Sequence, residues 1–286
     1  MYTSQGKAIG HGWPLLFVSA IAVTMTVGFS GLIGRAQGTK IPPINPAPQP
    51  SPKARPTPTP RRSPTPTIDK TAAAVAPSGA NFSYNFSGSQ LSSDWKLMNA
   101  DAQRWTMQPR QKSLLIQTQT GTLSDTKSLK NWLVLNRDLP ADDFEIIVEA
   151  SIQIQAIGNY VSIALVTDDQ NYFSVSFQGY CCGARRGPYF NKVFQGKNTY
   201  FGGAVRGDGA ATQPERIFLK IEREGNQYSG FYAYEDQPTT VEQIQWAKMG
   251  TLPWINFHGK LVLTAANYQD APEVAAEFYS VLIRKR

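Results

Sequence analysis

Residues 81–286 form a succession of short runs that alternate apolar and polar residues or are rich in β-branched and aromatic side chains. This pattern constrains the fold more than any other feature, because it predicts strands throughout the segment and no stretch of it has the periodicity of a long amphipathic helix. Turn-forming pairs such as Asp168-Asp169 and Gly225-Asn226 separate the runs. The predicted strands are 82–86, 113–119, 132–135, 144–154, 160–166, 172–177, 217–223, 228–234, 259–265 and 276–284. Many short strands at this spacing indicate one sandwich or barrel domain over residues 81–286.

The formal net charge of +7 lies entirely outside this predicted domain. Residues 1–80 contain eight basic residues and one acidic residue, whereas basic and acidic residues are equal in number over residues 81–286. A basic composition would suggest nucleic-acid binding only if the charge lay on the folded surface. We therefore predict no nucleic-acid partner.

A run of uncharged, mostly apolar residues follows an N-terminal tail of residues 1–12. Residues 13–33 would span roughly 30 Å as a helix, the thickness of the hydrocarbon core of a bilayer. We predict a transmembrane helix or signal anchor here, with the C-terminal domain extracytoplasmic, because long domains translocate largely regardless of flanking charge. The alternative is a signal peptide cleaved near Ala36, which would leave a secreted protein.

The segment between the apolar run and the predicted domain, residues 34–80, is basic and rich in proline. Twelve of the twenty prolines lie within residues 40–77. Proline fixes φ and lacks an N–H donor, so neither a helix nor a sheet can form there. The segment is predicted to be a disordered, extended linker.

Several of the strand patterns resemble a known superfamily. The sequences are DDFEIIVEASIQ (142–153), YVSIALVTDDQNYFSVSF (160–177) and IFLKIEREGNQYSGFYAYED (217–236). Their order is similar to that of the concanavalin A-like lectin/glucanase superfamily, and within it to the glycosidase-associated domain appended to some β-xylosidases. The resemblance implies an all-β fold, a two-sheet antiparallel jelly-roll sandwich, with a concave surface that faces carbohydrate.

A glycine-rich stretch, residues 179–209, interrupts the strand rhythm and supplies most of the candidate ligand-binding residues. It contains Tyr180, Tyr189 and Tyr200 together with Arg185 and Arg186. Aromatic faces pack against the C–H surfaces of sugars, and planar polar groups bind their hydroxyls. The bases would suit an anionic polymer. The alternative is that two extended hairpins cover one sheet and bury their own aromatic rings.

Four further candidates lie on predicted strands or turns. Trp132, Tyr172 and Trp254 are possible sugar-stacking rings, although large aromatic residues of a sandwich are more often in the core. Asn131 is a candidate because relatives of this fold often have an inward polar residue at such a position on the concave sheet.

Cys181 and Cys182 are the only cysteines, and they are adjacent in the sequence. Because there is no third cysteine, neither can bridge a distant partner within the chain. Their own Cα atoms are separated by about 3.8 Å, below the usual range for a disulfide. We predict a strained vicinal disulfide that shapes the loop of an exported protein.

The sequence predicts no catalytic residues, no metal site and no cofactor. Glu145 and Glu149 would share one face of a strand, as the paired carboxylates of a glycosidase must, but Ile147 occupies the central position. A hydrolase that uses Glu145 and Glu149 is therefore kept as an alternative. Asp168 and Asp169 could ligate calcium, although a hairpin turn is the commoner use of such a pair.

We therefore predict a non-catalytic module that binds carbohydrate or another cell-envelope polymer and is displayed on a membrane tether. A protein-interaction or adhesion module without a sugar site is the second alternative.

Overall fold

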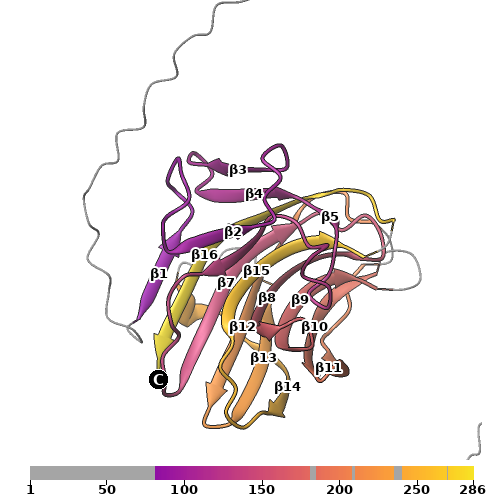
Figure 1. Cartoon of the computed structure of the whole chain (residues 1–286). Coiled ribbons are helices and arrows are strands. Elements are labelled where there is room, and N and C mark those ends of the chain that lie inside the picture. The colour runs from indigo at the N-terminus through magenta and orange to yellow at the C-terminus, as the bar shows by residue number, and fades with distance from the viewer. Residues whose placement is uncertain (1–80, 181–184, 208–209, 235–239, 269) are drawn as a thin grey trace, which may run out of the picture. The chain divides into compact units, whose positions relative to one another are not determined.

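The computed structural model describes residues 81–286 except 181–184, 208–209, 235–239 and 269. These residues form an all-β sandwich of two eight-stranded sheets, as predicted (Figure 1). The tail, the candidate membrane span 13–33, the linker 34–80 and the pair Cys181–Cys182 lie outside the described residues. Within the described part of the chain, no helix has the length and apolar character needed to cross a membrane.

Sheet A is built around β7, which lies between two antiparallel neighbours. In spatial order its strands are β14 (Ala247–Pro253), β13 (Gln227–Ala233), β12 (Glu215–Glu224), β7 (Phe144–Ile152), β16 (Ala275–Lys285), β4 (Ser113–Gln117) and β3 (Trp105–Gln108), and β1 (Phe82–Asn85) also pairs with β16. Among the described residues there is one 3₁₀ turn, η1 (Val241–Gln243), which follows β13 and precedes β14 in the chain.

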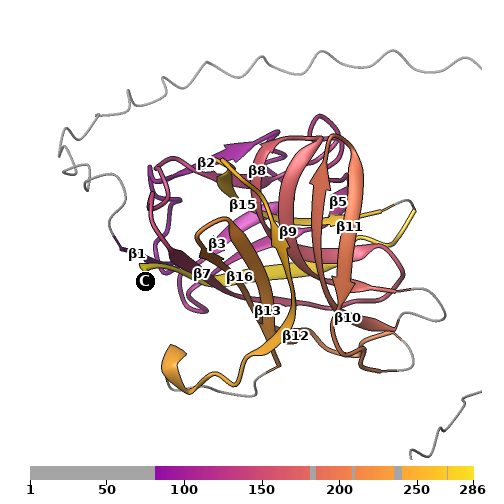
Figure 2. The same cartoon turned by 90° about the horizontal axis from the view of Figure 1, so that it is seen from below.

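Sheet B has β8 at its centre, between β9 and β15. In spatial order its strands are β11 (Lys197–Gly202), β10 (Arg186–Phe194), β9 (Asn171–Gly179), β8 (Asn159–Asp168), β15 (Lys260–Asn267), β6 (Trp132–Leu135) and β2 (Trp95–Met98), and the short β5 (Gln119–Thr120) pairs parallel to β15. Figure 2 shows β8, β9, β10 and β11 side by side in one layer. The stretch predicted as loops therefore supplies the strands β10 and β11, which extend sheet B instead of covering it.

The alternation of side chains along the strands assigns each residue to the core or to the outer face. On β9, Phe173, Val175 and Phe177 are fully buried between the sheets. Their neighbours Tyr172, Ser174 and Ser176 point to the opposite, outer face of sheet B. The same register continues across β8 and β10, because Ser162 pairs with Ser176 and Asn191 pairs with Ser174.

A loop of residues 121–131, the covering loop, packs over part of this outer face. Leu123 and Leu129 are buried in a small apolar cluster with Tyr160, Ala164 and Val262. The loop turns closely on itself at Gly121, where an added Cβ would lie 2.7 Å from the Cα of Leu129. Glycine is required for this approach, and the loop leaves the β8–β11 side of sheet B uncovered.

Candidate functional site

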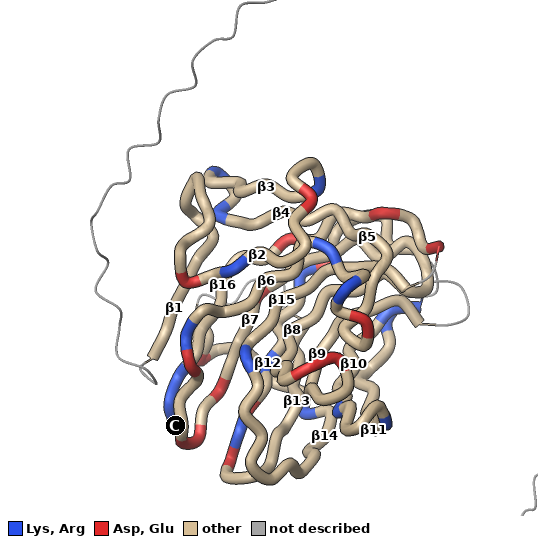
Figure 3. The backbone as a smooth tube through the Cα atoms, in the orientation of Figure 1, with Lys and Arg blue, Asp and Glu red and all other residues tan. Residues whose placement is uncertain are grey.

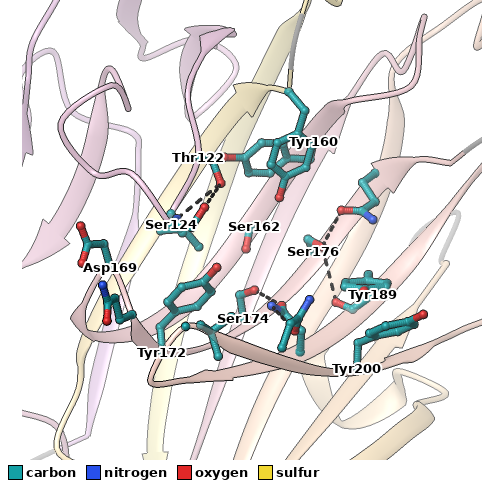
Figure 4. Close-up of a pocket in the computed structure, with 18 of the residues that line it drawn as sticks. Thr122, Ser124, Tyr160, Ser162, Asp169, Tyr172, Ser174, Ser176, Tyr189 and Tyr200 are labelled. Carbon is teal, nitrogen blue, oxygen red and sulfur yellow. Dashed lines mark hydrogen bonds between the residues drawn. The ribbon is translucent and has the colours of Figure 1, made fainter.

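A cleft of about 940 Å³ lies on the outer face of sheet B, over β8, β9, β10 and β11. Its floor consists of side chains from adjacent strands, and the covering loop borders one side (Figure 4). The volume lies within the range of roughly 300–1,000 Å³ that is usual for ligand pockets. The cleft brings together four of the nine predicted ligand-binding residues: Tyr172, Tyr180, Tyr189 and Tyr200.

Tyrosine rings form the walls of this cleft. Tyr189 and Tyr200 stack with their ring centroids 5.0 Å apart, and Tyr160 and Tyr268 stack at 4.8 Å. Figure 4 places Tyr160 and Tyr200 at opposite sides of the cleft, with Ser162, Ser174 and Ser176 between them. Tyr200 is 61% exposed, so one of its ring faces is available to a ligand. Such rings present flat apolar faces together with a hydroxyl group.

The floor between these rings is polar but uncharged. The Oγ of Ser174 donates a hydrogen bond to Oδ1 of Asn191, whose Nδ2 donates to Oδ1 of Asn198 at 3.3 Å. The Oγ of Ser162 donates to the carbonyl oxygen of Val175 at 3.2 Å. Each of these hydroxyl groups donates its proton to another atom of the protein. The lone pairs of the serine oxygens are left to accept hydrogen bonds from ligand hydroxyls.

The charged residues that line the cleft, among those the structure describes, are Asp169 and Lys197. Figure 3 shows Lys and Arg interspersed with Asp and Glu over the domain, while β9 carries no charge. Of the bases in the glycine-rich stretch, Lys197 lines the cleft, whereas Arg186 forms an ion pair with Glu215 and Lys192 donates to the carbonyl oxygen of Pro253 at 2.6 Å. Arg185 is exposed and does not line the cleft.

Burial raises the pKa of the cleft tyrosines. The pKa values of Tyr172 and Tyr189 rise to about 12, mainly through desolvation and then through neighbouring tyrosines. Desolvation also raises the pKa of Tyr160, Tyr180 and Tyr268. All five phenols are therefore neutral at physiological pH and can donate hydrogen bonds as well as accept them.

This upward shift leads to a prediction for alkaline pH. A phenol whose pKa is raised in the folded protein loses its proton first in the unfolded state, so the free energy of unfolding is unaffected below about pH 10 and falls as the pH rises toward about 12. Denaturant unfolding at increasing pH should show the free energy of unfolding decline in this range. In Tyr172→Phe the decline per pH unit should be smaller. Phenolate absorbance of the cleft tyrosines well below pH 10 would contradict the prediction.

The other predicted ligand-binding residues lie outside the main cleft. Asn131 is 1% exposed, accepts a hydrogen bond from the amide of Asp101 at 2.7 Å and supports the covering loop. Trp254 packs on Phe173 and Phe257 at the opposite side of sheet B. Trp132 lies on the outer face of the same sheet, at a second hollow near β6.

Glu145 and Glu149 lie on the outer face of sheet A, on the other side of the sandwich from the cleft. Glu145 forms ion pairs with Arg284 and Lys220, and Glu149 forms one with Arg216. Residues four apart on a strand are separated by roughly 13 Å, whereas a glycosidase pair needs roughly 5–9.5 Å. These two carboxylates therefore do not form a glycosidase pair.

Asp168 serves the turn between β8 and β9. Its Oδ1 accepts hydrogen bonds from the amide of Gln170 and the Nδ2 of Asn171, each at 2.9 Å. Among the described residues, no group of three or more His, Cys, Asp or Glu side chains is arranged to hold a metal ion.

Sequence reasoning missed the polar floor. Ser162, Ser174 and Ser176 lie in predicted strands and Asn191 lies in the glycine-rich stretch, but the polar face that they form together was not predicted. The signal was present in YFSVSFQ (172–178), where small polar residues alternate with fully buried aromatic and aliphatic ones. Polar residues at every second position of a central strand indicate that one face of the sheet is accessible to solvent. The sequence alone does not show that this strand is central.

No protein family model matches the sequence, and no curated protein is significantly similar to it. Solved structures are similar in fold. The GH43 protein BlXynB from Bacillus licheniformis is 19% identical with a TM-score of 0.57, and the match covers 71% of this chain and 39% of that one. A xylan β-1,4-xylosidase from Bacillus halodurans is 12% identical with a TM-score of 0.56 and the same coverages. The described domain has a concanavalin A-like fold.

GH43B of a Bacteroides ovatus xyloglucan locus is similar as well, at 12% identity with a TM-score of 0.55 over 71% of this chain. The chain spans about two fifths of the length of these proteins, each match covering 39% of the neighbour. The likeness confirms the concanavalin A-like sandwich expected from the strand patterns.

Proposed function

We propose that the protein is a non-catalytic carbohydrate-binding module and that the cleft on sheet B holds the sugar. The observation that carries the proposal is the combination of exposed tyrosine faces with a floor of serine and asparagine side chains. Stacking rings and hydroxyl-binding groups in one concave site are what sugar recognition requires. Structural neighbours named as a xylosidase and a xyloglucan-locus protein support a carbohydrate partner.

Two features favour binding over hydrolysis. Asp169 is the one carboxylate among the described residues of the cleft, whereas glycosidases generally use two. Glu145 and Glu149 are engaged with bases on the opposite sheet. The cleft thus supplies contacts to a sugar without the acid pair that would cleave it.

A glycan array probed with the full-length protein tests the proposal. We expect signal from carbohydrate polymers or their oligosaccharides, without release of reducing sugar. Release that disappears in Glu145→Gln would instead identify the hydrolase. An array without signal, combined with capture of a defined protein partner, would identify an interaction or adhesion module.

We also propose that residues 13–33 anchor the protein in a membrane and that the linker 34–80 holds the domain in the extracytoplasmic space. The length of the uncharged run and the proline content of the linker support this arrangement.

The anchor makes a direct prediction about fractionation. The full-length protein should remain with membranes after an alkaline carbonate wash, and protease added to intact cells should remove the domain. Deletion of residues 13–33 should abolish membrane retention. Recovery of a soluble extracellular form that begins after Ala36 would instead establish cleavage of a signal peptide.

A further inference from the structure

The outer face of sheet B carries a second cleft, of about 390 Å³, beside the first. Its floor is apolar and comes from three adjacent strands, with Val134 on β6, Val262 on β15 and Val166 on β8. Trp132 lines it, and Lys260 lies at its rim. We call this hollow, lined by Thr126, Trp132, Val134, Val166, Lys260 and Val262, the Trp132 cleft.

One narrow ridge separates the two clefts. Thr122, Leu123 and Ser124 of the covering loop line the first cleft, whereas Thr126 of the same loop lines the Trp132 cleft. The turn between β8 and β9 is divided in the same way. Asp169 lines the first cleft and the adjacent Asp168 lines the second, and Figure 4 shows Ser124 and Asp169 on the same side of the first cleft. A ligand that leaves the first cleft across this ridge therefore enters the second.

Trp132 gives the second cleft a ring that suits an apolar sugar face. It is partly exposed and packs against the apolar cluster beneath the covering loop. Its indole Nε1 is buried without a hydrogen-bond partner among the described residues. An unsatisfied buried donor carries a free-energy cost. A bound hydroxyl that reached Nε1 after a small shift of the loop would recover part of this cost.

The charges at the two clefts balance. Lys197 and Asp169 line the first cleft, and Lys260, Asp168 and His258 line the second. Neither cleft presents the cluster of bases that recognition of sulfate, phosphate or carboxylate groups uses. The two clefts together suit a ligand without formal charge.

We propose that the ligand is a neutral, linear polysaccharide that crosses the ridge and occupies both clefts at once. This inference rests on the proposed function and specifies the class of carbohydrate. Binding at two linked sites makes the second contact intramolecular, so the affinity for a chain long enough to span both clefts exceeds that for a short one.

Calorimetric titration of the full-length protein with xylo-oligosaccharides and xyloglucan oligosaccharides of increasing length tests this proposal. We expect affinity to rise by at least about tenfold once the chain spans the ridge, as linked sites allow. Trp132→Ala should abolish that rise, so that long and short oligosaccharides bind the variant with similar affinity. Binding of the long chains should not weaken in high salt.

A rise with length that persists in Trp132→Ala would overturn the two-cleft proposal and leave the proposed function intact. A polymer ligand that is bound only at low salt would overturn the proposal that the ligand is uncharged. An array on which no glycan binds would overturn both the inference and the proposed function. Trp132→Phe, which keeps a ring in place, provides a folded variant with an intermediate rise, and matching thermal unfolding curves confirm that each variant is folded.

Discussion

Replacement of Tyr200 by alanine should weaken glycan binding by roughly 30-fold, which corresponds to about 2 kcal/mol for the loss of an aromatic anchor. Tyr200 is 61% exposed on the edge strand β11, and its ring stacks on Tyr189 at the wall of the cleft. A sugar that packs on this ring loses its platform in the variant. Stability should change by no more than about 0.5 kcal/mol, because an exposed residue contributes little to the core.

Phe194 offers a matched control on the same hairpin. It is 43% exposed, but it packs on Trp254 instead of lining the cleft. Phe194→Ala therefore removes a ring of similar size and exposure and should leave glycan affinity unchanged. Tyr200→Phe separates the ring from the hydroxyl and should retain most of the binding. Equal losses in Tyr200→Ala and Phe194→Ala would mean that the hairpin as a whole, and not the cleft, contacts the sugar.

The sandwich itself was predictable because its long strands carry strong local patterns. Residues 144–154 and 160–166 alternate or are continuously apolar, and both become central strands, β7 and β8. The strands β10 and β11 were not predicted. Glycines at both ends of this hairpin look like loop residues, and β11 is exposed along its whole length, so its pairing depends on the neighbouring β10.

The site was predictable only in part, for a related physical reason. Tyrosines in a glycine-rich segment are visible in the sequence, and three of them, Tyr180, Tyr189 and Tyr200, line the cleft. Side-chain direction is not visible. Once residues 186–194 are known to form β10, the odd separation of Arg186 and Tyr189 places their side chains on opposite faces, and Arg186 pairs with Glu215 of sheet A. The direction of a residue near the end of a strand follows from register and edge packing, which depend on distant segments.

Lys220→Met should lower the free energy of unfolding by about 3 kcal/mol and leave glycan binding unchanged. Lys220 is 7% exposed on the outer face of sheet A. Its ammonium lies 3.6 Å from Glu145 and 3.2 Å from Glu222, and it sits over the rings of Phe231 and Trp246. Without it, Glu145 and Glu222 keep one arginine partner each, Arg284 and Arg286, but these largely buried carboxylates lose the counter-charge that they share and repel each other more strongly.

Chemical denaturation of single and double variants measures this coupling. Because Glu145 is 8% exposed and bound to Lys220, the double variant Lys220→Met with Glu145→Gln should lose less than the sum of the two single losses. Lys248→Met provides the control, since Lys248 lies over the same Phe231 ring at 5.6 Å but is exposed and forms no ion pair with a described residue. If Glu145 instead acts on substrate, Glu145→Gln will abolish turnover without destabilising the fold, and the structural role assigned to this network will be wrong.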